Sequence, residues 1–413
     1  MPNPSGTANI TASVEPLLKT RYSEIYHDII FRDHIVMGMV KKKALAGKTV
    51  QQAQRYGNGG GRGHTFSNAQ ANATDAKRTA FVITQSWTYG YQIVQNTDIR
   101  AANGDLGTIY DLFSDCMDAA MRACGDDEEL ILHGEGFGII GTISSNSGGG
   151  PWSLTLTIPQ QAINFEPGMV LVSAVAKNSA SLDTGTATVT AVDQQGGTVQ
   201  VTGNGGWTPT NTHVLSVQGN KIASANAQLN VGFRGWLPLT APVVGGGDNF
   251  FGVDRSESVV NLAGWRQTTS TGTLATDTKA LANNISRNSS AKPDMALYSF
   301  GNFDKLENLV DNKTRYPMPG RDVDVFYEAL QIGFAKGRLA ATPTPFMDED
   351  VFYVLQSDTW TLWSAGNEPV QSAIPDKQGF ITDFQSDARQ IRMVAQTIFS
   401  CDAVGWNGVG QVF

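Results

Sequence analysis

Residues Thr108–Cys124, with the sequence TIYDLFSDCMDAAMRAC, decide the fold predicted for this chain. Their apolar side chains recur at intervals of three and four residues, which predicts a helix with one apolar face along about four turns. Thr108 and Asp111 stand where a capping box would, so we expect the helix to begin there. Strands must then pack on its apolar face. The residues expected on that buried face are Ile109, Leu112, Phe113, Cys116, Met117 and Met121.

The composition is that of a folded protein with few charges. The chain has 413 residues, of which 41% are hydrophobic and 16% are charged, enough for a large core in two or three domains. Its net charge of −8 argues against general affinity for nucleic acids. The N-terminal residues lack the basic and apolar segments of a secretory signal, and no apolar run is long enough to span a membrane. The three cysteines form no CxxC pair, so burial as small apolar residues is their expected role.

The charge is unevenly distributed. Residues 41–78 contain eight basic residues and one acid, so this segment carries +7 and leaves −15 for the rest of the chain. Its centre, Tyr56–Gly63, is too rich in glycine for a helix or a regular strand, and aromatic strand-like sequence follows over Thr79–Ile99. The segment is either a flexible surface hairpin or an extended loop that reaches a partner. That partner could be nucleic acid, with Tyr56 and Phe66 stacking on bases, or the acidic surface of another copy.

Residues 142–222 differ from both flanks because only five of 81 residues are charged. Alternating apolar and polar runs are separated by turn signals such as Pro167-Gly168, which predicts a small all-β module inserted into the main fold. An α+β pattern resumes afterwards, with strands predicted at Met295–Ser299 and Val351–Leu355.

Motifs for enzyme chemistry are weak. Gly136, Gly138 and Gly141 match G-x-G-x-x-G, but the dinucleotide fingerprint needs a strand before it and a helix after it, and here the order is reversed. A helix-to-strand turn is the simpler interpretation. Asp348–Asp350 is interpreted as a solvated turn before a strand. The five histidines are scattered, so the sequence predicts no catalytic, cofactor-binding or metal site.

The order of these parts resembles a known family. An N-terminal arm, a basic hairpin containing Gly63–Phe66, a long helix, the turn LHGEGFGIIG (Leu132–Gly141) and GFAKGRLAATPTPFMDEDVFYVL follow one another. This order resembles the major capsid proteins of tailed bacteriophages, which have the Hong Kong 97-type fold that encapsulins also use. The resemblance covers nearly all the chain except residues 142–222.

The resemblance implies an α+β domain map. The parts would be the N-arm 1–40, the extended loop 41–97, the peripheral domain with its spine helix 98–141, the β-rich insertion domain 142–222, the peripheral-to-axial connection 223–265, the axial domain 266–372 and the C-terminal return to the peripheral domain 373–413. In the extended loop, the residues expected at a subunit interface are Lys48, Arg55, Arg62, His64 and Phe66.

By the same resemblance, the chain would be a structural protein of the virion, assembled in the host cytoplasm. It would self-assemble into hexamers and pentamers of an icosahedral shell enclosing double-stranded DNA without sequence-specific binding. A separate scaffolding protein, a portal and a possible decoration protein are implied as partners, with no cofactor and no membrane. The alternatives are an encapsulin-like compartment and a nucleotide-binding enzyme that uses Gly136–Gly141.

Overall fold

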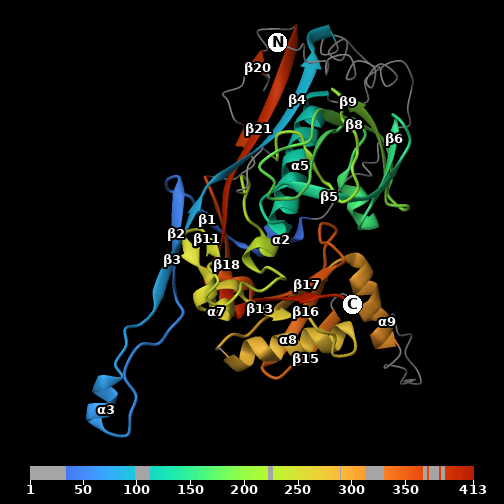
Figure 1. The fold of residues 1–413 in the computed structure, drawn as a ribbon. Coiled ribbons are helices and arrows are strands. Elements are labelled where there is room, and N and C mark those ends of the chain that lie inside the picture. The colour runs from blue at the N-terminus through green and yellow to red at the C-terminus, as the bar shows by residue number, and fades with distance from the viewer. Residues whose placement is uncertain are drawn as a thin grey trace, which may run out of the picture. The chain divides into compact units, whose positions relative to one another are not determined.

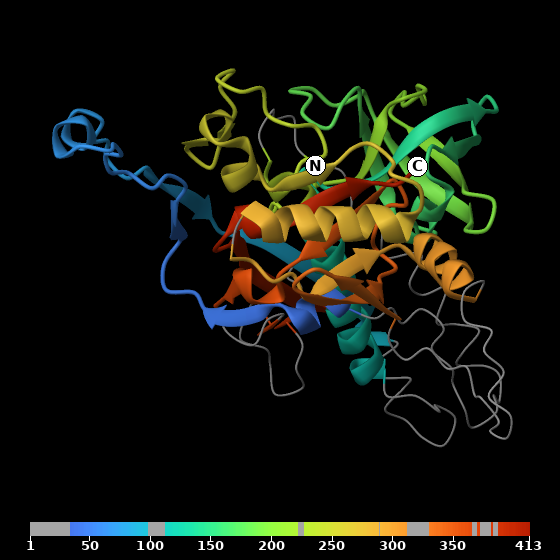
Figure 2. The same ribbon diagram turned by 90° about the horizontal axis from the view of Figure 1, so that it is seen from below.

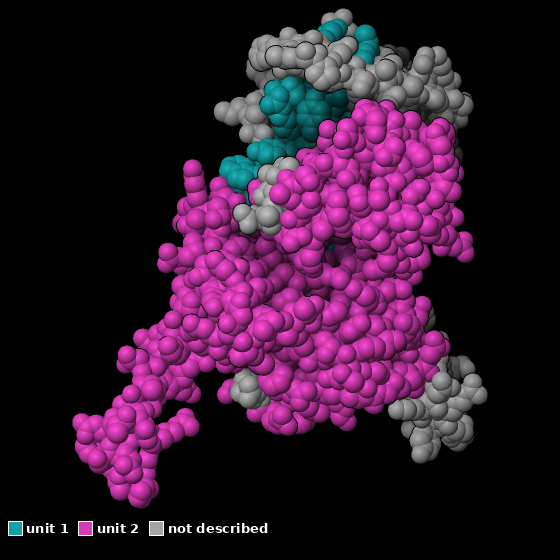
Figure 3. All heavy atoms as spheres, viewed as in Figure 1, with its two compact units in different colours: residues 1–34, 86–129, 364–397 teal, residues 35–85, 130–363, 398–413 magenta. Residues whose placement is uncertain are grey.

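The computed structural model describes residues 34–97, 112–221, 227–288, 290–311, 330–365, 370–371, 381–382 and 387–413. Figure 1 shows its helices and strands in chain order. The chain divides into two compact units, coloured teal and magenta in Figure 3. Unit 1 comprises residues 1–34, 86–129 and 364–397, and unit 2 comprises residues 35–85, 130–363 and 398–413. Each unit is described by itself.

Unit 1 contains most of the helix that was predicted from Thr108–Cys124. In the described residues this helix, α5, runs over Leu112–His133, and strand β4 (Ser86–Gln95) pairs with β21 (Ala388–Cys401) in antiparallel register. Gly90 of β4 allows the helix to lie directly on the strand, because a Cβ atom there would be 2.4 Å from the carbonyl oxygen of Ala120. Two short strands, β19 (Val370–Gln371) and β20 (Ile381–Thr382), also pair with β21.

The side chains predicted to form the buried helix face are only partly placed there. Cys116 is buried and Met117 packs beside it against Val94, Ile391 and Met393. Met121 is 38% exposed, so the prediction that it is buried is wrong for the isolated chain. Ile109 and the proposed cap at Thr108 lie outside the described residues. The described helix backbone includes Leu112 and Phe113, whose side chains lie outside the described part of the chain.

The helix does not end at Cys124 but continues through Gly125 and four consecutive acidic residues, Asp126–Glu129, to His133. Gly125 is needed because a Cβ atom there would be 2.8 Å from Cε1 of His34. The same histidine forms an ion pair of 2.7 Å with Asp126. Tertiary contacts in unit 1 therefore stabilise the helix across residues at which an isolated helix would end.

Unit 2 contains a six-stranded mixed sheet with the order β13-β22-β17-β14-β16-β15. β14 is parallel to β16 and β13 is parallel to β22, whereas the remaining neighbours are antiparallel. Helices α8 and α9 pack on this sheet, with α8 lying across it in Figure 2. All five residues of β17 are buried, which confirms the strand predicted at Val351–Leu355. The elements are β13 (Trp265–Gln267), α8 (Leu274–Asn288), β14 (Met295–Tyr298), α9 (Phe300–Asp311), β15 (Leu330–Phe334), β16 (Gly337–Pro343), β17 (Val351–Leu355) and β22 (Gly408–Gln411).

A closed six-stranded barrel forms the second part of unit 2, with the order β10-β5-β6-β9-β8-β7. Its interior is filled by large side chains such as Phe165 and Trp207, so it has a core of its own. The strand content predicted for residues 142–222 is confirmed, although the first strand begins three residues earlier. The strands are β5 (Ile139–Ser147), β6 (Trp152–Leu156), β7 (Val170–Ala174), β8 (Thr186–Asp193), β9 (Thr198–Asn204) and β10 (Val214–Val217), with the 3-10 helix η1 at Pro159–Asn164.

The remaining described elements of unit 2 are short. They are α2 (Ile35–Met39), β1 (Lys41–Ala44), β2 (Thr49–Arg55), α3 (Phe66–Ala71), β3 (Arg78–Thr84), α6 (Phe233–Trp236), β11 (Asn249–Phe250), β12 (Val253–Asp254), η2 (Arg255–Glu257), α7 (Val259–Ala263), η3 (Ser357–Thr359), β18 (Trp360–Ser364, whose last residue belongs to unit 1) and η4 (Val404–Trp406). Among the described residues, no helix is sufficiently long and apolar to cross a membrane.

Candidate subunit interface

The basic segment forms a two-stranded antiparallel ribbon. β2 and β3 pair over seven residues, from Thr49 opposite Thr84 to Arg55 opposite Arg78. Side chains alternate along the ribbon, so Phe81 and Ile83 are buried against unit 2 while Val82 between them is 44% exposed. Beyond its base, the ribbon projects from the helices and sheets of unit 2 (Figures 1 and 2).

The glycine-rich tip of this hairpin has a defined structure. Gly60 donates its amide to the carbonyl of Thr74 at 2.7 Å, and a short helix, α3, follows with its first turn capped by Thr65. Gly61 is required by close approach, since a Cβ atom there would be 1.6 Å from the carbonyl oxygen of Ala69. Phe66, the first residue of α3, is 83% exposed. The tip is therefore a folded element that presents an apolar ring to its surroundings.

Most cations of the hairpin have no acidic partner in the described residues. Arg55 lies directly opposite Arg78 in the ribbon, so two like charges face each other there. Only the base is partly neutralised, because Lys41 forms an ion pair of 2.8 Å with Asp358 and Lys43 lies 4.9 Å from the ring centre of Trp363. The cations of residues 41–78 without an ion pair to any described residue are Lys42, Lys43, Lys48, Arg55, Arg62, Lys77 and Arg78.

An aromatic cluster anchors the base of the hairpin. Phe81 of β3 is fully buried, with its ring centre 5.2 Å from that of Trp236 and 6.1 Å from that of Phe250. The backbone amide of Val82 donates to the carbonyl of Phe251 at 3.0 Å. Edge-to-face rings of this kind stabilise a packing beyond the area that they bury.

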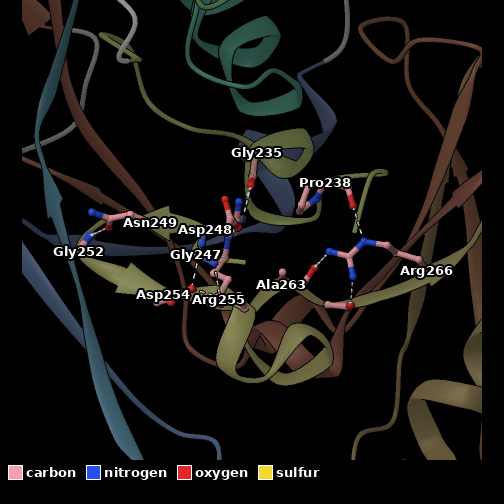
Figure 4. Close-up of polar contacts among 12 residues, drawn as sticks. Gly235, Pro238, Gly247, Asp248, Asn249, Gly252, Asp254, Arg255, Ala263 and Arg266 are labelled. Atoms are coloured by element: carbon pink, nitrogen blue, oxygen red, sulfur yellow. Dashed lines mark hydrogen bonds and ion pairs between the residues drawn. The ribbon is translucent and has the colours of Figure 1, made fainter. Parts of the chain in front are cut away.

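Two arginines hold the segment that supplies these rings (Figure 4). Arg255 donates from Nε to Asp248 at 2.7 Å and from Nη1 to the carbonyl of Gly235 at 3.0 Å, and its guanidinium lies 4.0 Å from the ring centre of Phe250. Arg266 donates to the carbonyls of Pro238, Gly264 and Ala263 at 2.7, 3.1 and 2.9 Å. Burial, followed by the charge of Arg255, lowers the pKa of Arg266 to about 10, so Arg266 remains charged at neutral pH.

A second charged cluster joins the barrel to the rest of unit 2. Arg234 contacts Asp348 at 2.6 Å, Asp350 at 2.7 Å and Glu135 at 3.5 Å. The predicted turn before a strand is confirmed, but its carboxylates are not simply solvated: the side chains of Asp348 and Asp350 are 28% and 37% exposed and both pair with Arg234. Burial raises the pKa of Asp348, and Arg234 offsets only part of that rise. From the barrel side, Lys177 pairs with Glu135 at 2.5 Å and Gln161 donates to Asp348 at 2.7 Å.

The structure brings together only part of the predicted interface. Arg62, His64 and Phe66 share the exposed tip, and Arg55 lies at the outer end of the ribbon. Lys48 lies at the opposite end, where its carbonyl accepts from Gln85 at 3.0 Å. The sequence analysis missed the anchor at Trp236, Phe250 and Arg255, for which the only signal was a local density of aromatic residues.

The glycine motif has the geometry of a turn. Gly136 and Gly138 have positive φ angles of 82° and 65°, and they connect the end of α5 to the start of β5. No helix of the described chain begins at these amides, so they lack the helix N-terminus on which the dinucleotide fingerprint depends. The helix-to-strand interpretation is confirmed.

No family model matches the sequence, and no curated protein matches it. A solved structure of the cyanophage A-1(L) capsid asymmetric unit matches with a TM-score of 0.57 and 11% identity, over 97% of this chain and 98% of that chain. The encapsulin complex from Synechococcus elongatus matches at a TM-score of 0.47 and 7% identity, over 97% of this chain and 94% of the other. The capsid of a native GTA particle matches with a TM-score of 0.46 and 7% identity, over 98% of this chain and 99% of that chain. Only the first likeness is close enough to support an argument, and it concerns the fold: the mixed helix-and-sheet chain has the fold of a phage capsid protein.

Proposed function

We propose that this protein is a major capsid protein of a tailed bacteriophage, which self-assembles into the hexamers and pentamers of an icosahedral shell around double-stranded DNA. The observation that carries the proposal is the folded hairpin, which presents cations without an ion pair to any described residue and, at its tip, an 83% exposed phenylalanine at Phe66. The fold shared with the cyanophage capsid protein agrees with this proposal.

Assembly with other copies gives the hairpin the partner it needs. A two-stranded ribbon is marginally stable by itself, and its exposed face carries like charges that repel one another. The rest of each copy carries −15, which provides carboxylates for a +7 segment. Each exposed pair contributes only about 0–1 kcal/mol, but a shell repeats these pairs at every contact. Obligate interfaces typically bury about 2,000–5,000 Å² in total.

The proposed layout is the Hong Kong 97-type arrangement, with the N-arm, the extended loop, peripheral and axial domains and the barrel as an insertion domain. A scaffolding protein, a portal and a decoration protein would be its partners in the virion, assembled in the host cytoplasm. An acidic inner surface would let DNA enter without adhering. Base stacking by Tyr56 is less favoured, because its hydroxyl is hydrogen-bonded to Glu257, whereas the exposed ring of Phe66 is free to contact a neighbouring copy.

Gel filtration followed by negative-stain electron microscopy tests this function. Purified protein should elute in the void volume and appear as closed shells of uniform diameter. Particles from infected cells should release nuclease-sensitive double-stranded DNA when opened. Monomers at every concentration would contradict the proposal, and shells filled with a specific protein would favour the encapsulin-like alternative instead.

A further inference from the structure

The 3-10 turn η2 acts on the hairpin at two places, indirectly near Phe81 and directly at Tyr56. Its first residue, Arg255, lies over Phe250, which packs on Phe81 of β3. Its last residue, Glu257, accepts a hydrogen bond from the hydroxyl of Tyr56, which directly follows β2. We propose that the Arg255–Glu257 turn clamps the extended hairpin at two points and thereby sets the direction in which the basic tip projects.

The contact near Phe81 is rigid because the side chain of Arg255 is held in place over the ring of Phe250. Its side chain is only 8% exposed, and it is held by Asp248 on one side and by the carbonyl of Gly235 on the other (Figure 4). Phe250 is thereby trapped between the guanidinium and Phe81. A buried cation over an aromatic face adds to the packing of that ring.

The second contact, at Tyr56, holds both the side chain and the backbone of that residue. A carboxylate oxygen of Glu257 accepts a hydrogen bond from the hydroxyl of Tyr56, and Nδ2 of Asn261 donates to the carbonyl of Tyr56 at 3.2 Å. Asn261 is itself fixed by a hydrogen bond of 3.0 Å to Oγ of Ser258. The hydrogen bond to Glu257 raises the pKa of Tyr56, so the phenol stays protonated and remains a donor at neutral pH.

The separation of the two contacts is what fixes a direction. Phe81 pairs with Gln52 in the ribbon, and Tyr56 lies four residues further along that strand. At about 3.4 Å per residue the contacts are about 14 Å apart. A ribbon held at one point can pivot, whereas a ribbon held at two points cannot. Between these contacts, Nε2 of Gln54 donates to the carbonyl of Cys401 at 2.9 Å. Within the described chain, no hydrogen bond or ion pair of residues 57–77 reaches beyond the hairpin, so the contact at Tyr56 is the outermost one and acts most directly on the direction of the tip.

The consequence for assembly rests on the proposed function. If the tip meets a neighbouring copy, a change in its direction moves Arg62 and Phe66 away from their partner surface. Arg255, Glu257 and Tyr56 would then be positioning residues, which act on assembly without contacting the neighbour themselves.

Distance measurements between two spin labels test the clamp independently of assembly. Ser67→Cys on α3 and Lys279→Cys on α8 provide exposed labelling sites in unit 2, and all three native cysteines are buried. The parent protein, measured as purified unassembled subunits, should give a single narrow distance distribution. Tyr56→Phe and Glu257→Ala should each broaden the narrow peak, and the double variant should be no broader than either single variant, since both substitutions remove the same hydrogen bond.

Arg255→Lys should also broaden the peak, because an ammonium lacks the planar fork with which the guanidinium donates to Asp248 and Gly235 while it covers the ring of Phe250. Glu166→Ala, an exposed glutamate on the barrel, is the control and should leave the distribution unchanged. Thermal melting close to that of the parent would show that the variants are folded. A narrow, unshifted peak in the Glu257→Ala and Arg255→Lys variants would overturn the clamp. Broadened variants in a protein that never forms shells would support the clamp and contradict the proposed function.

Discussion

Replacing Glu128 with glutamine should remove a loss of stability that the native protein suffers as the pH rises. Glu128 lies on α5 in unit 1 and is 1% exposed. One carboxyl oxygen accepts from the hydroxyl of Thr397 at 2.9 Å. No cation that the structure describes pairs with this carboxyl group, so burial disfavours its ionised form.

The size and sign of the effect follow from the pKa of this group. Burial raises the pKa of Glu128 from 4.5 to about 7, and the hydroxyls of Thr88 and Thr397 offset only part of the rise. Because the folded-state pKa is above the unfolded one, the stabilising contribution is complete below pH 4.5 and is lost as the pH rises through about 7. A shift of this size corresponds to about 3 kcal/mol of unfolding free energy.

Urea unfolding of the parent and of Glu128→Gln between pH 5 and pH 9 checks this prediction. The parent should lose about 3 kcal/mol relative to the variant across this range. The comparison uses the pH slope, since the buried amide can add a constant offset. Asp118→Asn, an exposed change on the same helix, should keep the parental slope. Equal slopes for the parent and Glu128→Gln would show that this carboxyl group is solvated or paired.

Three further changes test the packing of unit 2. Phe81→Ala should lower the unfolding free energy by about 3–5 kcal/mol, whereas Val82→Ala on the exposed face should change it little; equal losses would place the ribbon faces wrongly. Arg234→Met should destabilise the protein at pH 7 by leaving three carboxylates together, and lowering the pH toward about 4 should restore part of the loss, as measured by thermal melting. Replacing the barrel strands, Ile139–Val217, with a Gly-Ser linker should leave a soluble folded remainder, since Ile139 pairs with Ser216 and the ends of the barrel meet; insoluble protein would mean that the barrel core is needed for folding.

The elements that sequence predicted well are those set by local pattern. Val351–Leu355 and Met295–Ser299 are buried apolar runs bounded by turns, and both appear as strands with nearly the predicted bounds. The alternating runs of residues 142–222 also appear as strands. A two-residue period and a turn signal are properties of a few adjacent residues, so no knowledge of distant contacts was needed.

Predictions that depended on distant contacts fared worse. Gly125 and the acidic residues after it signal a helix end, yet the helix continues because Gly125 accommodates His34 and Glu128 reaches Thr397. The charge of Asp348 predicts exposure to solvent, yet its side chain is partly buried and forms an ion pair with Arg234, which is far away in the sequence. The two-point clamp joins Glu257 to Tyr56 across 201 residues, and no local pattern encodes such a pairing.

The central claim is that the basic hairpin joins copies of this chain into a shell. The most direct test is the shell yield of the Arg55→Glu, Arg62→Glu double variant, measured by sedimentation and electron microscopy together with DNA binding in the same preparation. We expect folded subunits that fail to close into shells and negligible intrinsic DNA affinity in both proteins. Parental assembly should weaken as salt rises, because exposed charges are screened beyond about 8 Å at 0.15 M. Normal shells from the double variant, with loss of salt-sensitive DNA retention, would contradict the account and make the hairpin a nucleic-acid contact.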